Sequence, residues 1–288
     1  MDLTIILRTC GSSGVLSNET HRICGTDRQT LVLKCVKSLI ESINNITSKI
    51  PVKLYVLDDH SEKQFLTEIE DIISTCRIPF EIINLSDKPD DFKYSYNFSA
   101  YEQFRYGRDV AKDLVYMVED DYLHSHDAIQ AMLDAYSLLR NLTDLNSVAL
   151  YPYDSTHNYK RFPEACRLFY ITEHQRLWRT TTKTANTIFM NADDIRKYWP
   201  LFDILAREYN GDGTGANEDI TINRIWNNTV NQAGPVCLFS PIPSVAIHVS
   251  FDEPVYLTPE LNNWREKYDS LNVRNSKPEN LWTKVAKL

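Results

Sequence analysis

The stretch Leu114–Tyr122 constrains the fold more than any other part of the chain, because five apolar residues run directly into Glu119, Asp120 and Asp121. A short continuous apolar run is typical of a strand buried on both faces of a parallel sheet. Ligands of open α/β sheets bind just outside the carboxyl ends of the strands. Acidic oxygens at such an edge favour a hard cation, Mg²⁺ or Mn²⁺, bridging to substrate phosphates. The alternative is a solvated acidic turn before the next helix.

The residues before this stretch alternate between strand-like and helix-like patterns. Apolar runs predict strands over residues 3–7, 52–57 and 80–85. Three capping boxes, which begin at Thr26, Ser61 and Ser99, predict the starts of the helices between them. This alternation is typical of a wound parallel sheet in an α/β domain.

The second half of the chain is less regular. We expect a helix over 125–140, strands over 147–151, 184–190 and 243–250, and a helix over 195–207 that Pro200 interrupts. Residues 152–178 lack periodicity, so loops are expected there. A glycine-rich loop over 211–215 precedes Asn217, which is expected to cap a helix. We predict one catalytic domain over 1–250 and a C-terminal extension, 251–288, packed on it.

Composition limits the classes of function. The net charge of −8 and a pI near 5.4 argue against a general nucleic-acid binder. No apolar run has the length of a transmembrane segment, and residues 1–8 lack the pattern of a signal peptide. The six cysteines form no CxxC pair, which is consistent with reduced thiols. We therefore expect a cytoplasmic protein with no nucleic-acid partner.

The order of these motifs resembles the GT-A glycosyltransferases, particularly the large family of inverting nucleotide-sugar transferases, over roughly residues 3–250. Residues 58–61, Asp-Asp-His-Ser, look like that family's V-D-D-G-S segment, with His60 in place of glycine. Residues 118–121 look like its D-x-D metal motif, with Glu119 as the first acid. The resemblance implies a Rossmann-like three-layer αβα fold with a mostly parallel sheet.

The resemblance also implies a cation site for Mn²⁺ or Mg²⁺. Asp121 is the first candidate for a direct ligand, and Glu119 is expected to act directly or through water. His248 matches the position of a further ligand in some GT-A enzymes, although a histidine in an apolar strand is often only a hydrogen-bonded core residue. Asp120 is expected to face the ribose or a neighbouring strand, because alternate residues of an extended segment point opposite ways.

Residues at the first two strand ends are the expected contacts of the nucleotide. Arg8 and Thr9 are candidates to reach the base, and Asp58 or Asp59 to accept hydrogen bonds from base or ribose. A plain surface ion pair for Arg8 and a helix cap at Asp59 are the alternatives. On the helix before the acids, Gln103, Arg105 and Arg108 are the nearest candidates for the pyrophosphate side, and Arg105 is the one chosen.

The late element Glu218-Asp219 looks like the family's acidic pair that deprotonates the acceptor. Asp219 is the expected general base and Glu218 the reserve, while the alternative is an acidic first turn that favours the helix dipole. The resemblance therefore implies a metal-dependent, inverting glycosyltransferase that moves a sugar from a nucleotide sugar to a glycan hydroxyl. A metal-dependent nucleotidyltransferase or phosphoesterase, and a non-catalytic carbohydrate-binding protein on the same fold, are the competing predictions.

Overall fold

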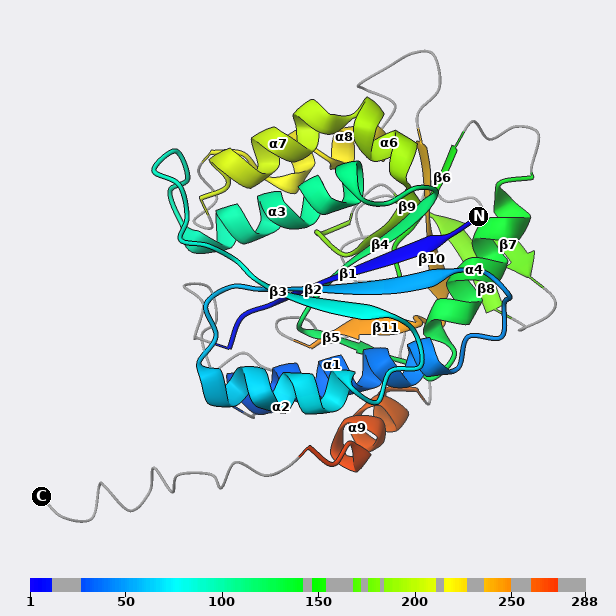
Figure 1. Cartoon of the computed structure of the whole chain (residues 1–288). Helices are drawn as coiled ribbons and strands as arrows, with labels where there is room; N and C mark the ends of the chain where they lie inside the picture. Colours follow the sequence, from blue (N-terminus) through cyan, green and yellow to red (C-terminus); the bar gives the residue numbers. More distant parts are fainter. Residues whose placement is uncertain are drawn as a thin grey trace, which may run out of the picture.

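The computed structural model describes residues 1–11, 27–141, 147–153, 168–171, 176–181, 184–210, 215–226, 236–249 and 260–273. These residues form a nine-stranded sheet between two layers of helices (Figure 1). In spatial order the strands are β3 (Phe80–Asn84), β2 (Val52–Asp58), β1 (Leu3–Thr9), β4 (Leu114–Glu119), β9 (Ile188–Asn191), β6 (Ser147–Leu150), β10 (Val236–Ile242), β8 (Arg176–Thr180) and β7 (Leu168–Ile171).

The sheet is mostly parallel, which confirms the predicted α/β class. Strands β3, β2, β1 and β4 are parallel neighbours, and β6 is parallel to β10. Only β9 and β8 run against the others, because each pairs antiparallel with both of its neighbours. Four of the parallel strands therefore end at one edge of the sheet.

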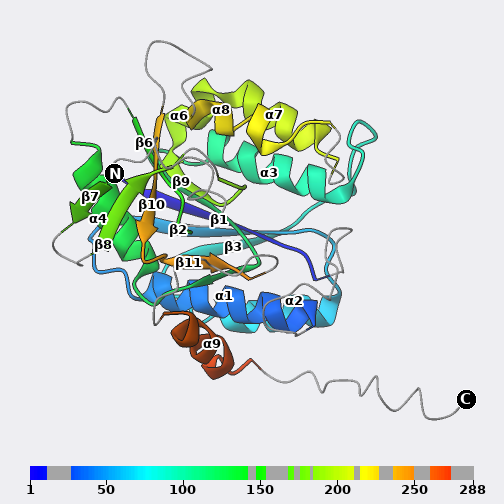
Figure 2. The ribbon, with the colours of Figure 1, turned by 180° about the vertical axis from the view of Figure 1, so that it is seen from behind.

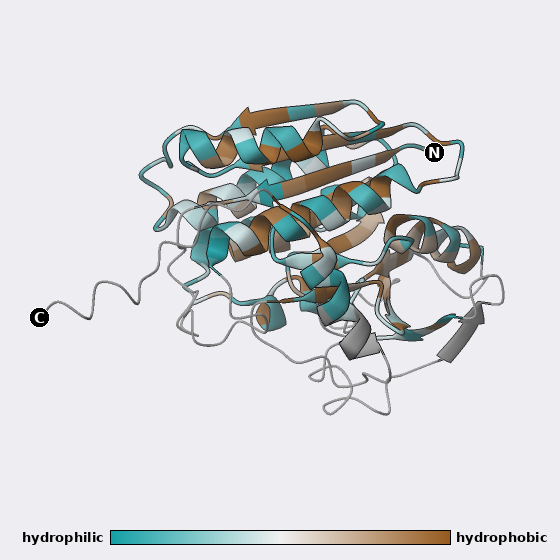
Figure 3. Cartoon of the chain, turned by 90° about the horizontal axis from the view of Figure 1, so that it is seen from below, coloured by the Kyte–Doolittle hydropathy of each residue, from teal (hydrophilic) through white to brown (hydrophobic). Residues whose placement is uncertain are grey.

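Helices cover both faces of the sheet. Figures 1 and 2 show α1 (Arg28–Asn44), α2 (Lys63–Ile73) and α4 (Ala128–Leu139) on one side, and α3 (Ser95–Asp109), α6 (Ala192–Lys197), α7 (Trp199–Glu208) and α8 (Asn223–Trp226) on the other. Figure 3 shows hydrophobic strands between helices that carry hydrophobic and hydrophilic stripes, as burial of one helix face requires. None of the described helices is long and apolar enough to cross a membrane.

Part of the C-terminal region packs outside α1 as a further helix, α9 (Glu260–Ser270). Lys34 and Lys37 of α1 donate through Nζ to the carbonyl oxygens of Tyr268 and Asn272, both at 2.7 Å. The side chains of Trp264 and Tyr268 are buried. This stretch of the predicted extension therefore lies against the domain, while residues 250–259 and 274–288 are outside the described part.

Helix starts differ from the capping-box predictions. Helix α1 is capped by Asp27, whose carboxylate accepts from the N–H of Thr30 at 2.9 Å, and α2 begins after Glu62. Ser61 does not cap α2, because its hydroxyl donates to Asp58. Helix α3 begins at Ser95, four residues before the predicted serine. The box pattern was wrong at Ser61 and Ser99, whose hydroxyls donate to Asp58 and to the carbonyl oxygen of Tyr96 instead. Thr26, one residue before the cap of α1, lies outside the described residues.

The second half departs further from the predicted pattern. Strands β7 and β8 lie in the segment that was expected to be loops, and β10 was not predicted. Trp178 and Arg179 of β8 are only 1% exposed, so burial against β10 stabilises a strand without apolar alternation. The helix expected after Asn217 is instead a 3-10 turn, η3 (Glu218–Ile220), followed by α8. The last predicted strand is shortened to β11 (Ala246–His248), which pairs with β5 (Tyr122–His124).

A buried histidine lies where β5 meets the main sheet. His124 is fully buried; its Nε2 is 2.7 Å from the Tyr116 hydroxyl, and its Nδ1 is 3.0 Å from the carbonyl oxygen of Tyr122. A carbonyl can only accept, so Nδ1 carries the proton and Nε2 accepts from Tyr116. Burial lowers the pKa of His124 to about 3, so the ring is neutral.

This histidine should make stability fall with acid below neutrality. The unfolded ring binds a proton near pH 6.5 and the folded ring only near pH 3. The contribution of His124 to the free energy of unfolding is therefore complete above pH 6.5 and is lost progressively between pH 6.5 and pH 3. We expect a loss of roughly 1.5 kcal/mol between pH 6.5 and pH 5 from this residue. Urea unfolding of the parent and of His124→Gln, at both values, measures it. An equal change in the free energy of unfolding for both proteins would contradict the assignment.

Candidate functional site

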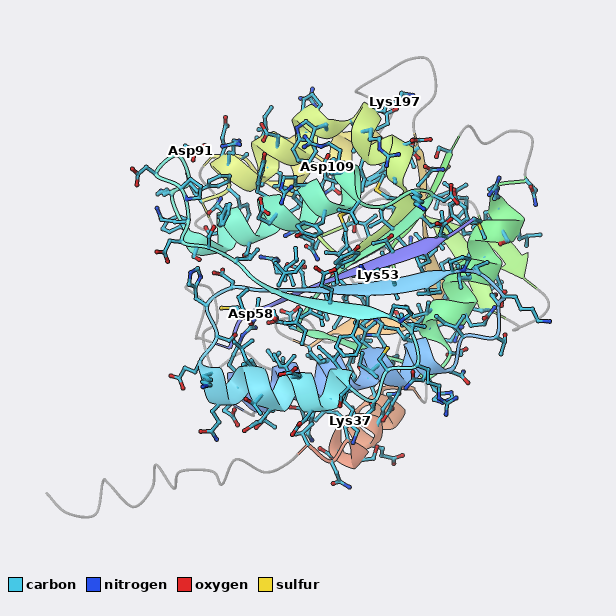
Figure 4. The ribbon with its side chains drawn as sticks, viewed as in Figure 1. Lys37, Lys53, Asp58, Asp91, Asp109 and Lys197 are labelled. Carbon is cyan, nitrogen blue, oxygen red and sulfur yellow. The ribbon has the colours of Figure 1, made fainter. Side chains whose placement is uncertain are left out.

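Sheet register brings the polar ends of three strands together. Thr9 of β1 lies opposite Asp58 of β2, and Arg8 lies opposite Glu119 of β4. Figure 4 shows Asp58 at this carboxyl-end edge, where β1, β2 and β4 finish. The register therefore brings the polar ends of β1, β2 and β4 to one edge of the sheet.

Each of the three consecutive carboxylates has a different basic partner. Repulsion between Glu119 and Asp120 is offset because separate elements deliver the guanidinium groups of Arg8 and Arg28. The closest atoms are 2.6 Å apart for Glu119 and Arg8, 2.6 Å for Asp120 and Arg28, and 3.1 Å for Asp121 and His248. The three consecutive acids therefore lie in three different environments and do not form one acidic patch.

Asp121 and His248 meet because β5 pairs with β11. His248 lies opposite Tyr122 in this pair, and the N–H of Val249 donates to the carbonyl oxygen of Asp121 at 2.9 Å. Oδ2 of Asp121 is 3.1 Å from Nε2 of His248, and the two side chains remain 15% and 24% exposed. The structure thus brings two of the three predicted metal ligands together at an accessible position.

The third predicted ligand, Glu119, is held by other groups. Its Oε1 accepts from Arg8 at 2.6 Å and from Nδ2 of Asn186 at 3.3 Å, while its backbone N–H donates to Thr187. Within the described ranges, no group of three or more histidine, cysteine, aspartate or glutamate residues is placed to hold a metal. In this structure Glu119 is therefore an ion-pair partner of Arg8, and the accessible pair is Asp121 and His248.

Asp120 faces the connection after β1. Its Oδ2 accepts from the N–H of Cys10 at 2.8 Å and its Oδ1 from Nη2 of Arg28 at 2.6 Å. Burial raises the pKa of this carboxyl, and the charge of Arg28 acts in the opposite direction. Of the two predicted orientations, the structure has the one toward a neighbouring strand, so Asp120 is a structural anchor with 5% exposure.

Thr9 and Asp58 are both completely buried, which corrects their predicted role as nucleotide contacts. Asp58 accepts from the hydroxyl of Thr9 at 3.0 Å and from the N–H and hydroxyl of Ser61 at 2.9 and 2.6 Å. Ser61 in turn accepts from the N–H of Gly11 at 2.7 Å. A buried carboxylate with three donors fixes the turn after β2 and offers no surface to a nucleotide.

Asp59 and His60 follow Asp58 at the end of β2, and their side chains contact each other. His60 has a φ of 57°, in the left-handed region that favours glycine. Its Nδ1 is 2.9 Å from Asp59 and its Nε2 is 3.1 Å from Asp87. The hydrogen bond to Asp59 is the main reason that the pKa of His60 is raised. Asp59 also accepts from the hydroxyl of Ser95, at the start of α3.

Arg105 does not reach this edge. Helix α3 starts beside Asp59, and Arg105 lies ten residues further along, about 15 Å away at 1.5 Å per residue. Arg105 forms ion pairs with Glu102 at 2.6 Å and with Asp109 at 3.7 Å. Figure 4 shows Asp109 on α3. The prediction for Arg105 fails because its helix runs away from the strand ends.

The two acids predicted to serve as the general base, Asp219 and Glu218, lie on η3. The side chain of Asn217 caps this turn through the N–H of Ile220, as predicted. Asp219 is exposed and accepts from Nδ2 of Asn223 at 3.2 Å, and Asn223 accepts from the N–H of Thr184 at 2.9 Å. Thr184 begins the segment that contains Asn186 and Thr187. Asp219 is thus tied by side chains to the loop that contacts Glu119.

Glu218 is half-buried on the same turn. Burial, and then the charges of Glu218 and Glu119, raise the pKa of Tyr209, so both acids lie near this tyrosine. Gly215, at a φ of 80°, lets the chain turn back onto the end of α7, where a Cβ would lie 2.5 Å from the carbonyl oxygen of Glu208. Residues 211–214 of the predicted glycine-rich loop lie outside the described part.

Sequence reasoning missed several residues that complete the site, namely Arg28, Ser95, Asn186 and Thr187. A single polar residue whose partner is far away in sequence belongs to no local motif, so the sequence alone does not mark it as part of a site. Only Arg28 had a usable signal, because it is the first cation of the helix that follows β1, where α/β sheets place ligand contacts.

Comparison with known proteins gives only distant likenesses among solved structures. No family model and no curated protein matches the chain. S. aureus TarS is 12% identical, with a TM-score of 0.42, over 83% of this chain and 36% of TarS. An active-site mutant of the galactosyltransferase LgtC is 15% identical, with a TM-score of 0.42, over 83% of this chain and 72% of LgtC. The inositol-1-phosphate CTP transferase from T. maritima is 10% identical, with a TM-score of 0.42, over 93% of this chain and 96% of the transferase.

These matches include a galactosyltransferase and a CTP transferase. The chain spans 36% of TarS and 60% of its 1–349 fragment. At such identities and TM-scores the likenesses do not assign a function, so the function has to be inferred from the residues of the site.

Proposed function

We propose that this chain is a GT-A-type glycosyltransferase that transfers a sugar from a nucleotide sugar to a glycan hydroxyl. The observation that carries the proposal is the pair of Asp121 and His248, 3.1 Å apart and partly exposed, at the carboxyl end of β4. His60 lies at the end of the neighbouring strand β2, and the acidic pair Glu218 and Asp219 is linked through Asn223 to the Thr184–Thr187 segment that contacts Glu119. Such an arrangement provides for a charged donor and a hydroxyl nucleophile together.

The donor atoms of this pair fit a divalent cation. An octahedral ion with bonds of about 2.1 Å holds two adjacent ligand atoms about 3.0 Å apart, close to the observed 3.1 Å. Carboxylate oxygens suit Mg²⁺ and Mn²⁺, and neutral imidazole is a common metal ligand. The remaining ligands would be phosphate oxygens and water. A bound cation would supply charge stabilisation to the departing diphosphate.

The chain's own residues would divide the remaining work. His60, whose side chain is 43% exposed, is the accessible polar group at the end of β2, where the base or ribose of the donor would lie, and the buried Asp59 holds it in place. Arg8 holds Glu119 in place beside the Asn186 loop. Asp219, with Glu218 in reserve, would remove the proton of the acceptor hydroxyl as its oxygen attacks the anomeric carbon, which gives inversion.

A thermal-shift screen tests the proposal directly. Nucleoside diphosphates and nucleotide sugars are added in Mn²⁺ and in EDTA, and any hit is then assayed for transfer to a panel of glycans. We expect one nucleotide family to stabilise the protein in Mn²⁺, by about 2.7 kcal/mol at a hundredfold excess over its Kd. Release of pyrophosphate from a nucleoside triphosphate would instead indicate a nucleotidyltransferase. Stabilisation by glycans alone would indicate a carbohydrate-binding protein.

A further inference from the structure

The two arginines that face the acids use their donors differently. Arg8 donates from Nη2 to Glu119 and from Nη1 to the carbonyl oxygen of Tyr96 and the hydroxyl of Ser99. Arg28 donates from Nη2 to Asp120 and from Nε to the carbonyl oxygen of Cys10. A guanidinium has five N–H groups. Two of those on Arg28 are used within the described residues, so both N–H groups of Nη1 and one of Nη2 remain.

We propose that Arg28 binds the diphosphate of the donor through these remaining N–H groups while Nη2 stays paired with Asp120. The inference rests on the proposed function, because the diphosphate is that of the nucleotide sugar. Arg28 is the first residue of α1, immediately after the β1–α1 connection, and its side chain keeps 19% exposure. It is therefore available to a ligand at the edge where the strands end.

The position of Arg28 relative to the cation pair supports this role. Nη2 of Arg28 is 2.6 Å from Asp120, the residue next to Asp121 in the chain. Burial acts to lower the pKa of Arg28, but the charges of Asp120 and then Asp121 raise it. A phosphate oxygen held near Asp121 and His248 would meet a fixed positive group beside it. Planar guanidinium groups recognise phosphates through paired hydrogen bonds.

Asp120 and Cys10 hold the guanidinium in position before any ligand arrives. Asp120 is 5% exposed and accepts from both Arg28 and the N–H of Cys10, and Cys10 also accepts from Arg28 through its carbonyl. A side chain that is already ordered loses little conformational freedom on binding. The alternative is that Arg28 serves only as the counter-ion of Asp120, and the two roles predict different binding data.

Isothermal calorimetry with inorganic pyrophosphate, in Mn²⁺ and in EDTA, separates these roles. The variants are Asp120→Asn, Arg28→Lys, and the double variant Arg28→Gln/Asp120→Asn, which leaves no unpaired buried carboxylate. Arg105→Gln is the matched control, since Arg105 is also ion-paired but lies along α3, away from the strand ends. Apo melting temperatures show that each variant is folded.

We expect the double variant to bind pyrophosphate at least about tenfold more weakly than Asp120→Asn in both conditions, because a charge-assisted hydrogen bond is lost. Arg28→Lys should fall between them, and Arg105→Gln should match the parent. Equal affinity of Asp120→Asn and the double variant, or no pyrophosphate binding by the parent, overturns the role of Arg28. Pyrophosphate binding that depends on Arg28, in a protein without transfer activity, would instead overturn only the proposed function.

Discussion

Replacing Asp219 by asparagine is expected to leave nucleotide-sugar affinity unchanged and to reduce transfer to the acceptor by at least about a hundredfold. A general base typically contributes 10²- to 10⁴-fold to a rate, and an amide cannot take the proton. The affinity should survive because the proposed donor contacts lie at the ends of β2 and β4, not on η3. Asparagine also keeps an oxygen that can accept from Asn223, so the link from η3 to α8 is retained.

Turnover on a panel of glycans, with donor affinity by calorimetry, measures the effect. Glu218→Gln is the matched variant, because Glu218 lies on the same turn and near Tyr209. If Glu218→Gln loses transfer and Asp219→Asn does not, the two roles are exchanged. If both variants transfer at the parent rate, the acidic pair is only the start of a turn, and an inverting mechanism with this base is excluded.

Replacing Asp121 by alanine is expected to abolish the gain in nucleoside diphosphate affinity that Mn²⁺ or Mg²⁺ provides. Removing one of the two proposed protein ligands takes away the proposed carboxylate contact of the cation. His248→Ala should weaken the same metal-dependent affinity with little change in the apo melting temperature, because the imidazole is partly exposed. Glu119→Gln should keep most of the gain, because Glu119 is held by Arg8 and Asn186.

Calorimetric titrations in Mn²⁺ and in EDTA provide the comparison. Equal affinities of the parent protein in both conditions would remove the cation from the proposal. A large fall in apo stability for His248→Ala, with an unchanged response to metal, would make His248 a structural residue of the β5–β11 pair. If Glu119→Gln loses the gain in nucleoside diphosphate affinity that Mn²⁺ provides, Glu119 is a ligand of the cation.

The sequence predicted the layered α/β architecture because the relevant information is local. Residues 114–118 are apolar without interruption, and such a run is stable only when both faces of a strand are buried. The apolar stripe of α1 similarly reports one buried helix face. The polar strand ends also follow from the sequence, since parallel strands must end at a common edge.

The predictions failed where local patterns compete with distant partners. Ser61 has the spacing of a helix cap, yet its hydroxyl accepts from the N–H of Gly11, 50 residues away, and donates to Asp58. Asp58 and Thr9 have the types of residue that contact a nucleotide, yet each is buried against the other. Residues 176–180 lack strand periodicity, and they form β8 because β10, nearly 60 residues later, supplies the pairing.

By itself the sequence determined that three adjacent acids follow a buried strand and that His60 stands where the resembled family has glycine. Only the tertiary structure decided which basic group faces each acid. Arg8, Arg28 and His248 are 111, 92 and 127 residues from their partners. Sheet register and the β5–β11 pairing bring them together, and no local pattern encodes a separation of that length. The physical reason is that side-chain charge pairing depends on where the strands end in space, whereas strand formation depends mainly on neighbouring residues.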